Sequence, residues 1–421
     1  MSITKSLNLI FEDNLVGKIY LDSDQIFCFD YSEAWLKSPD AFAVSQSLPL
    51  KKITYTNDAE LFFSNLIPEA KLRKLVAHRL GISEDNNFSF LQFLGEDCAG
   101  AFRITTESTP HKNKSSIYNE IELSRIIDVY NKQPIFYLGF AQEEMRLSLA
   151  GAQDKVALFY DNKKFFLPGS GQSPSSHILK LPSKDYAYIA QNEYYVSQLA
   201  NDCEIMTQPM QLLEKKEFTA LLIERYDRYK DATDKKIRRL HQEDFCQALS
   251  IGHQQKFEAE GGPSFKQAFD LIESVSSNVI EDQQRLLKWI FFNICVGNCD
   301  HHGKNLSLRR SLNNQWHLSP FYDLLCTKVY KHISKQQAMS IGGRFDGANL
   351  SSQNWQIQMK EINYSYRKFR EDIALNIIDT LHISLDEHLA YFKGHACYQF
   401  MQEIKKEILT GLRRAELGLR D

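Results

Sequence analysis

The sequence has 421 residues, of which 43% are hydrophobic and 24% are charged, and its formal net charge at pH 7 is −3. This is the composition of an ordinary globular protein, and the length predicts two or three domains. The small negative net charge argues against broad nucleic-acid binding by this chain alone, because neutralising many phosphates needs clustered Lys and Arg.

Three features of the sequence indicate a cytoplasmic protein. The first residues, MSITKSLNLI, lack the basic start, apolar centre and small-residue cleavage site of an export signal. The longest apolar stretch, 286–296, is interrupted by Lys288 and Asn293 and is too short to span a bilayer, so it predicts a buried helix. The eight cysteines include no CxxC pair, which favours reduced thiols. We therefore expect a cytoplasmic protein that does not enter a membrane.

The predicted elements divide the chain into three parts. Residues 1–107 are rich in strand and turn signals and predict a small N-terminal domain, followed by a polar surface loop at 108–116. Residues 117–230 predict a sheet with one helix; the expected strands are 155–160, 164–167, 177–181 and 219–224, with a turn at Asp161–Asn162 and a helix at 189–203. Residues 231–421 are mostly helical, with helices expected at 242–251, 264–276, 282–297, 364–382 and 396–417.

A polar stretch between two predicted helices, GNCDHHGKN at 297–305, carries the strongest chemical signal. Phosphoryl transfer needs a carboxylate that receives a hydroxyl proton, together with oxygen ligands for Mg²⁺. Asp300 and Asn305 have the spacing of a kinase catalytic loop, and Asp323 offers a second metal carboxylate. Lys304 lies near where a transferred phosphoryl oxygen would sit. The spacing alone is weak, because a loop in which Asp and Asn cap turns gives the same pattern.

The sheet upstream supplies the other parts of a nucleotide site. The small-residue turn LAGA precedes a strand and can bring backbone N–H groups close to phosphate. Lys180 lies on a later strand, and Glu193 shares a helix face with apolar residues, so a Lys–Glu pair that holds nucleotide is predicted. The alternative is that Lys180 and Glu193 are unrelated surface charges. The strand that ends at 224–226 falls where a hinge between two lobes would offer its backbone to adenine.

Six motifs then occur in the order found in HipA-like kinases, which the sequence resembles over nearly its whole length. They are SLAGAQDK, HILKLP, IERYDR, RLHQEDFCQAL, GNCDHHGKNLSL and FYDLL. The N-terminal motifs SLPL, FFSNLIPEA and GEDCAGAF are similar to the small N-terminal subdomain of this family. The resemblance implies an α+β, two-lobed protein-kinase-like fold, related to lipid kinases, with a β-rich N-terminal subdomain and a mostly helical C-terminal lobe.

The resemblance also implies a role for each matching residue. Asp300 and Lys304 would be catalytic, and Asn305 and Asp323 would bind Mg²⁺. The residues that would bind ATP are Leu149, Ala150, Gly151, Ala152, Lys180, Glu224, Arg225, Tyr226, His302, Asn305 and Asp323, with Glu193 in support. Ser148 matches the serine that these kinases phosphorylate on themselves, and a phosphate beside the ATP phosphates would switch the enzyme off by repulsion.

The expected function is therefore that of an ATP- and Mg²⁺-dependent serine/threonine kinase acting as the toxin of a toxin–antitoxin pair. The resemblance implies a HipB-like DNA-binding antitoxin as partner, with DNA engaged only through it, and an aminoacyl-tRNA synthetase as a candidate substrate. Two departures from the family pattern are Cys299, where many relatives have Thr, and His301 before His302.

Two alternatives to an active kinase stay open from the sequence. One is a zinc hydrolase, because Cys and His are zinc ligands, and the residues concerned are Cys295, Cys299, Asp300, His301 and His302. The other is a catalytically weak kinase fold that serves as a regulatory or binding module beside a DNA-binding antitoxin.

Overall fold

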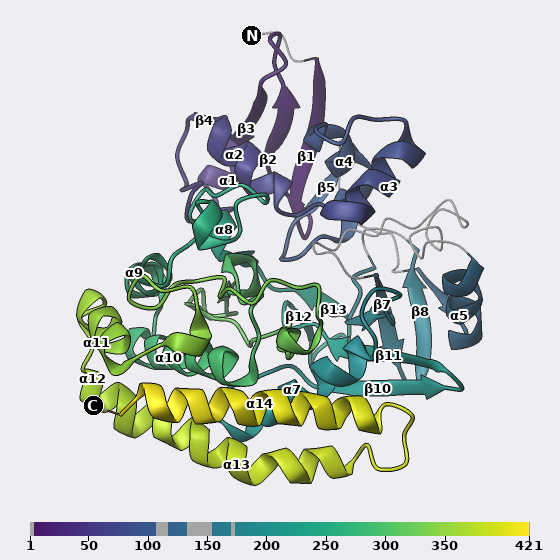
Figure 1. Cartoon of the computed structure of the whole chain (residues 1–421). Coiled ribbons are helices and arrows are strands. Elements are labelled where there is room, and N and C mark those ends of the chain that lie inside the picture. Colours follow the sequence, from purple (N-terminus) through teal and green to yellow (C-terminus); the bar gives the residue numbers. More distant parts are fainter. Residues whose placement is uncertain (1–3, 107–116, 133–153, 170–172, 421) are drawn as a thin grey trace. The chain divides into compact units, whose positions relative to one another are not determined.

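The computed structural model describes residues 4–106, 117–132, 154–169 and 173–420. These residues form two compact units, whose helices and strands are labelled in Figure 1. Unit 1 combines residues 1–181 with 224–254, and unit 2 combines residues 182–223 with 255–421. The chain therefore leaves unit 1 after β9 and returns to it at the end of β11. The division into three domains predicted from the sequence stays a prediction.

Unit 1 begins with an antiparallel sheet of five strands in the order β4-β3-β2-β1-β5. The strands are β1 Lys5–Phe11, β2 Asn14–Leu21, β3 Phe27–Tyr31, β4 Thr54–Tyr55 and β5 Arg103–Thr105. The helices packed in the same region are α1 Glu33–Leu36, α2 Asn57–Ser64, α3 Ala70–Leu80, α4 Asn87–Leu94 and the 3₁₀ turn η1 Gly95–Asp97. Their aromatic residues form the core, in which Phe29 and Phe63 are fully buried with ring centroids 5.7 Å apart.

A second sheet in unit 1 contains four neighbouring strands in the order β9-β7-β8-β6. They are β6 Tyr118–Ile121, β7 Lys155–Asp161, β8 Lys164–Pro168 and β9 His177–Lys180, and helix α5 Leu123–Lys132 follows β6. The predicted strands are confirmed, but the turn lies one residue later than expected. Asp161 pairs with Lys164, so Asn162 and Lys163 form the turn with φ of 49° and 64°. Positive φ at both positions matches the twist of a two-residue hairpin.

The segment that returns to unit 1 after β11 corrects one prediction. It contains β12 Arg228–Lys230, β13 Ile237–Arg239, β14 Gln242–Asp244 and α8 Phe245–Ala248. The helix expected at 242–251 is therefore wrong in its extent. Asp244 caps the helix reciprocally with Gln247, which fixes its start, and Ser250 with φ of 54° does not continue it.

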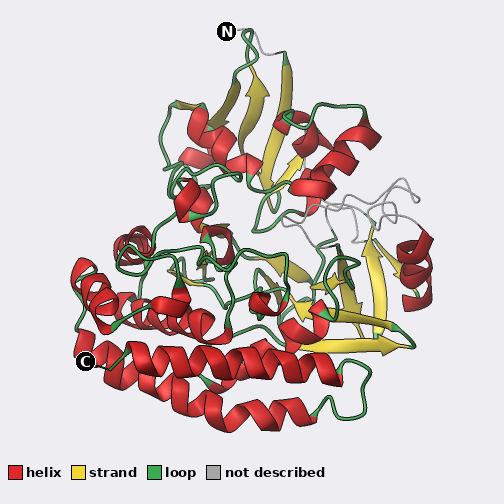
Figure 2. Cartoon of the chain, viewed as in Figure 1, coloured by secondary structure: helices red, strands yellow, loops and turns green. Residues whose placement is uncertain are grey.

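Unit 2 is mainly helical and has two hairpins (Figure 2). The helices are α7 Ile189–Asp202, α9 Phe265–Val275, α10 Val279–Val296, α11 Ser352–Glu361, α12 Tyr366–Lys368, α13 Leu375–Ala390 and α14 Tyr398–Gly418, and η6 Phe369–Ala374 is a π-helix between α12 and α13. Short 3₁₀ turns are η2 Glu258–Glu260, η3 Gly303–Asn305, η4 Thr327–Val329 and η5 Gly347–Asn349. The hairpins are β10 Met210–Lys215 with β11 Phe218–Glu224, and β15 Ser307–Arg310 with β16 Trp316–Leu318.

Helix α10 is the centre of unit 2. Every residue from Leu286 to Val296 except Lys288 is buried, which confirms the buried helix predicted there. Gly411 of α14 packs so closely against α10 that a Cβ at this position would lie 2.2 Å from the carbonyl oxygen of Cys295. The strand β10 and the helix α11 were not predicted, and the helical stretch expected at 364–382 continues to Ala390.

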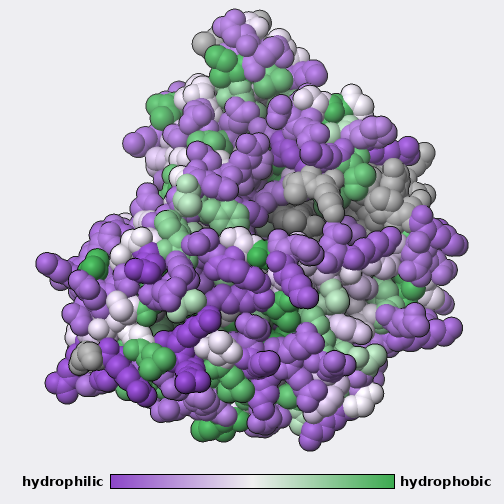
Figure 3. All heavy atoms as spheres, in the orientation of Figure 1, coloured by the Kyte–Doolittle hydropathy of each residue, from purple (hydrophilic) through white to green (hydrophobic). Residues whose placement is uncertain are grey.

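Hydrophobic side chains are scattered among polar ones on the face of the molecule shown in Figure 3. None of the helices in the described ranges combines the length and the hydropathy needed to cross a bilayer.

Candidate catalytic site

The predicted catalytic loop begins where helix α10 ends. Gly297 has φ of 72° and ends the helix in the left-handed conformation that glycine adopts without steric cost. The N–H of Asn298 still bonds to the carbonyl of Asn293, at 2.9 Å, so the first loop residue is fixed to the helix. The loop then passes through η3 into β15. Regular elements on both sides therefore restrain the loop.

Asn298 is the hydrogen-bonding centre of this loop. It is 1% exposed, and its Nδ2 donates to Oδ1 of Asn293, at 2.7 Å, and to the carbonyl of Asp323, at 3.3 Å. Its Oδ1 accepts from the N–H of Asp300 at 3.1 Å. A buried amide can both donate and accept, so one neutral side chain links the helix, the loop and the segment around Asp323. Asn298 was not among the site residues predicted from the sequence, because its burial is visible only in the fold.

Asp300 is the most exposed member of the loop. Its side chain is 49% exposed, while Lys304 and Asn305 are buried. Nε2 of His302 lies 3.8 Å from Oδ1 of Asp300. Nδ2 of Asn305 donates to the backbone carbonyl of Asp300 at 2.8 Å, which directs the amide of Asn305 toward the same loop. The carboxylate of Asp300 can therefore be reached by a substrate hydroxyl while its backbone is held from both sides.

Asp323 has a backbone conformation that is uncommon for a residue with a side chain. Its φ is 55°, in the left-handed region, which costs about 1–3 kcal/mol and is found preferentially at functional sites. Tyr322 helps to hold it, because its hydroxyl donates to the carbonyl of Lys304 at 2.8 Å and lies 2.7 Å from Oγ of Ser307. The bond from Asn298 supports the other side. The structure thus joins Asp300, Asn305 and Asp323 through one hydrogen-bond network in unit 2.

The residues of this network fit a magnesium site. Mg²⁺ prefers oxygen ligands from one or two carboxylates together with phosphate oxygens and water. Asn305 uses its Nδ2 for the bond to Asp300, which leaves its Oδ1 as an oxygen ligand. Asp323 is half-buried and supplies a carboxylate. The chemistry of the available donors is therefore that of a hard cation.

The same region does not support the zinc alternative. Burial raises the pKa of the Cys295 and Cys299 thiols, and zinc needs the thiolate. The Nδ1 of the buried His301 already bonds to the carbonyl of Asn298 at 2.8 Å, so this ring nitrogen is not available to a metal ion. Among the residues that the structure describes, no three or more His, Cys, Asp and Glu side chains group to hold a metal ion.

The remaining predicted site residues are divided between the two units. Lys180 lies on β9 in unit 1, and Glu193 lies on α7 in unit 2; they are 6% and 2% exposed. The alternative that both are surface charges is therefore wrong, while their pairing stays a prediction. Glu224 ends β11, and the N–H of the next residue, Arg225, donates to the carbonyl of Ser176 at 3.0 Å.

Of the other predicted nucleotide-binding residues, Tyr226 is described by the structure. The hydroxyl of Tyr226 donates to Oε1 of Gln242 at 2.5 Å, so its side chain is fixed within unit 1. Ser148 and the predicted phosphate loop at 149–152 lie outside the described residues.

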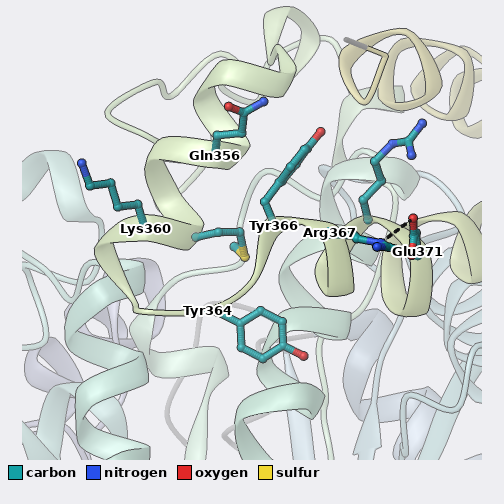
Figure 4. A pocket seen from close by; sticks show the side chains of 8 residues that line it. Gln356, Lys360, Tyr364, Tyr366, Arg367 and Glu371 are labelled. Carbon is teal, nitrogen blue, oxygen red and sulfur yellow. Dashed lines mark hydrogen bonds and ion pairs between the residues drawn. The ribbon is translucent and has the colours of Figure 1, made fainter.

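A pocket of about 760 Å³ lies elsewhere in unit 2, around the π-helix η6 (Figure 4). Its walls include Tyr364 and Tyr366, and none of the predicted site residues lines it. Its arginines are already engaged: Arg367 pairs with Glu371 at 3.0 Å, and Nε of Arg370 donates to the carbonyl of Leu419 at 3.1 Å. The predicted catalytic residues therefore do not depend on this pocket.

Comparison with known proteins places the chain in a family. Residues 7–105 match the family model described as HipA N-terminal domain, and residues 147–389 match the HipA-like C-terminal domain. The chain is 36% identical to a putative kinase, Y4mE, of Sinorhizobium fredii, over 89% of both chains. It is 29% identical to the serine/threonine-protein kinase toxin HipA of Shewanella oneidensis, over 82% of this chain and 81% of that protein.

A solved structure agrees with these sequence matches. The structure of HipA with HipB and operator DNA from Shewanella oneidensis superimposes with a TM-score of 0.83, at 25% identity and 97% coverage of both chains. The α+β kinase-like fold predicted from the sequence is thereby confirmed. The chain belongs to the family of HipA-like kinases.

Proposed function

We propose that this protein transfers the γ-phosphoryl group of ATP to a serine or threonine hydroxyl of a protein. The observation that carries the proposal is the network centred on Asn298, which holds Asp300, Asn305 and Asp323 in one part of unit 2. A loop whose only task was to cap turns would not need a half-exposed carboxylate linked through Asn298 to a second acid in a left-handed backbone conformation.

In the proposed reaction, Asp300 accepts the proton of the attacking hydroxyl. The hydroxyl oxygen forms a bond to the γ-phosphorus while the bond to the bridging oxygen breaks, and ADP leaves. Lys304 directly precedes Asn305 in the same loop and would interact with the transferred group. Asn305 and Asp323 would hold Mg²⁺, which would supply positive charge to offset that of the phosphate oxygens. Lys180, the loop at 149–152 and the backbone at 224–226 would hold the nucleotide.

Transfer of labelled phosphate from ATP to a protein acceptor tests this assignment. We expect Asp300→Asn and Asp323→Ala to abolish transfer without unfolding the protein, because both side chains lie at the edge of the network. Asp372→Asn is a matched control, since Asp372 is an exposed acid of the same unit. Full activity of Asp323→Ala would contradict the metal assignment. A wild-type protein that binds ATP but transfers nothing would support the alternative of a regulatory module.

The toxin role is a further part of the proposal. The similarity to the Shewanella oneidensis HipA, solved as a complex with HipB and operator DNA, supports a HipB-like antitoxin as partner and DNA contact through it. Growth of cells that express the wild-type chain, compared with the Asp300→Asn form, with and without the antitoxin, tests this role. Equal growth in all four cases would contradict it.

Substrate and self-regulation follow from the resemblance rather than from the described residues. An aminoacyl-tRNA synthetase is the proposed substrate class, and Ser148 is the proposed site of inactivating autophosphorylation. Phosphoproteomics of cells with the active chain against the Asp300→Asn form tests the first. Mass spectrometry of purified protein after incubation with ATP tests the second, and phosphate found only on another serine would contradict it.

A further inference from the structure

Unit 1 contains a buried cluster of ionic side chains, of which the proposed function uses only the backbone of Arg225. Asp97 comes from η1 beside the N-terminal sheet, and Arg225, Asp227 and Arg228 follow strand β11. All four are at most 6% exposed. Arg239 of β13 adds a third guanidinium, 3.3 Å from Asp97. Residues from three separate stretches of the sequence therefore converge in one water-excluded place.

The contacts within this ionic cluster are short and numerous. Arg225 bonds to both carboxylate oxygens of Asp227, at 2.9 and 2.7 Å. Arg228 bridges the two acids, donating to Asp227 at 2.8 Å and to Asp97 at 2.9 Å. The hydroxyl of Ser175 donates to Asp97 at 2.7 Å and accepts from Arg225 at 2.9 Å. Bidentate and charge-assisted bonds of this kind fix orientation as well as distance.

The charge balance of the ionic cluster depends on Asp97. Burial alone would raise the pKa of this carboxyl, but Arg228 and Arg225 hold it well below its usual range, so it stays ionised. Asp97 and Asp227 together face three arginines. Without the charge of Asp97, a single carboxylate would face the three guanidinium groups, and these would repel one another in a medium of low dielectric constant.

The ionic cluster reaches the proposed nucleotide site along the backbone. Arg225 is the central residue of the segment 224–226, to which we have assigned adenine. Its side chain lies in the cluster, and its N–H bonds to Ser176. Ser175 and Ser176 directly precede β9, the strand that carries Lys180. A shift of the cluster would therefore move both the proposed hinge and the start of β9.

We infer that Asp97 is a positioning residue for the nucleotide: it fixes the backbone of the hinge segment through Arg225 and Arg228. The N-terminal domain then contributes to nucleotide binding, because its Asp97 orients the hinge segment. This inference rests on the proposed function, because it concerns the segment assigned to adenine. It predicts that loss of the Asp97 charge weakens recognition of adenine more than the chemical step.

Titration calorimetry of the full chain with ATP and with GTP tests the inference. For Asp97→Asn we expect the affinity for ATP to fall by about tenfold, the effect of misaligned hinge hydrogen bonds. The affinity for GTP should fall less, so that the preference for ATP shrinks. The kcat at saturating ATP should stay within about threefold of wild type. A merely structural role would lower the binding of both nucleotides alike.

Control variants keep the experiment decisive. Glu33→Gln removes an acid from an exposed ion pair with Lys52 in the same N-terminal region, and it should leave both affinities unchanged. If Asp97→Asn does not fold, Ser175→Ala takes its place, because it removes one neutral hydrogen-bond partner of Asp97. We expect Ser175→Ala to lose a smaller part of the preference for ATP over GTP. Folded variants that keep the wild-type preference overturn the inference. A wild-type chain that binds neither nucleotide overturns the proposed function first, and the inference with it.

Discussion

Two polar regions of this protein solve the problem of buried hydrogen-bonding groups in opposite ways. The ionic cluster around Asp97 in unit 1 is built from full charges that compensate one another. The network around Asn298 in unit 2 is built from neutral amides and backbone groups. In the first arrangement, the acids and arginines of the cluster form ion pairs with one another. The second holds a loop in place through an amide side chain and backbone groups, and the half-exposed carboxylate of Asp300 lies on that loop.

The comparison contrasts charges that pair with one another inside the fold with charges that the proposed reaction would use. A carboxylate that is fully paired with arginines is held in its ionised form and has little capacity for an added proton or metal ion. A half-exposed carboxylate such as that of Asp300 keeps more of that capacity. The four predictions that follow test this distinction, starting with the largest expected effect.

The largest expected effect is the loss of stability on removing Arg228 from the ionic cluster. Arg228→Met leaves Asp97 and Asp227 without the group that bridges them, and breaking a buried ion pair in this way costs about 3–5 kcal/mol. Urea unfolding followed by circular dichroism measures the change. Arg367→Met removes an exposed arginine that pairs with Glu371 and should change stability little. Equal stability of the two variants would mean that Arg228 in the ionic cluster contributes no more to the free energy of unfolding than an exposed arginine does.

Replacing the amide of Asn298 by a carboxyl group should disrupt catalysis. Asn298→Asp keeps the shape of the side chain, but it removes the donor to Asn293 and Asp323 and adds a negative charge beside them. We expect activity to fall by about 100-fold, because small misplacements of catalytic groups have effects of this size. Phosphate transfer at saturating ATP, with thermal unfolding as control, measures both properties. Wild-type activity in Asn298→Asp would show that the network does not position the loop.

The packing behind the amide network offers a sharper test. Gly411→Ala places a Cβ against the carbonyl of Cys295, two residues after Asn293 on the same helix. Overpacking of this kind costs about 1–3 kcal/mol. We expect lower stability together with reduced activity, because α10 carries the loop. Thr410→Ala, an exposed change on α14 next to Gly411, is the control. A drop in stability with unchanged activity would separate the loop from the helix.

A buried acid without arginines should respond to pH in the opposite direction from Asp97. Glu243 is fully buried and is held by neutral donors, the hydroxyl of Ser45 and the N–H of Gln46, and its burial raises the pKa to about 8 from 4.5. The folded state then binds more protons than the unfolded state, so stability falls as pH rises between these values. The slope is at most about 1.4 kcal/mol per pH unit.

Urea unfolding between pH 5 and pH 8, for wild type and Glu243→Gln, measures this slope. We expect the slope to flatten in the variant, because glutamine does not titrate. An unchanged slope would assign the pH dependence to other groups.

The sequence was sufficient for most of the elements that carry the site. Alternation and strand-forming residues predicted β7, β8 and β9, and the long apolar stretch predicted the buried part of α10. These signals are local, so the sequence records them directly. The helix expected at 242–251 was wrong because a capping box at Asp244 and a strand before it override helical propensity. The candidate residues Asp300, Asn305 and Asp323 were found through the ordered motifs of the family. The spacing of Asp300 and Asn305 alone is not specific.

What the sequence by itself determined is the family, the candidate residues of the predicted catalytic loop and most of the elements around them, because these depend on residue type and on neighbours along the chain. The tertiary structure decided how distant residues share their hydrogen bonds. Only the fold brings Asp97 to Arg225 and Arg228, more than 120 residues away, and only the fold makes Asn298 the support of Asp323. Ionic and amide partnerships form across space between groups that have no signature of pairing in the sequence, so they become visible only when the chain is folded.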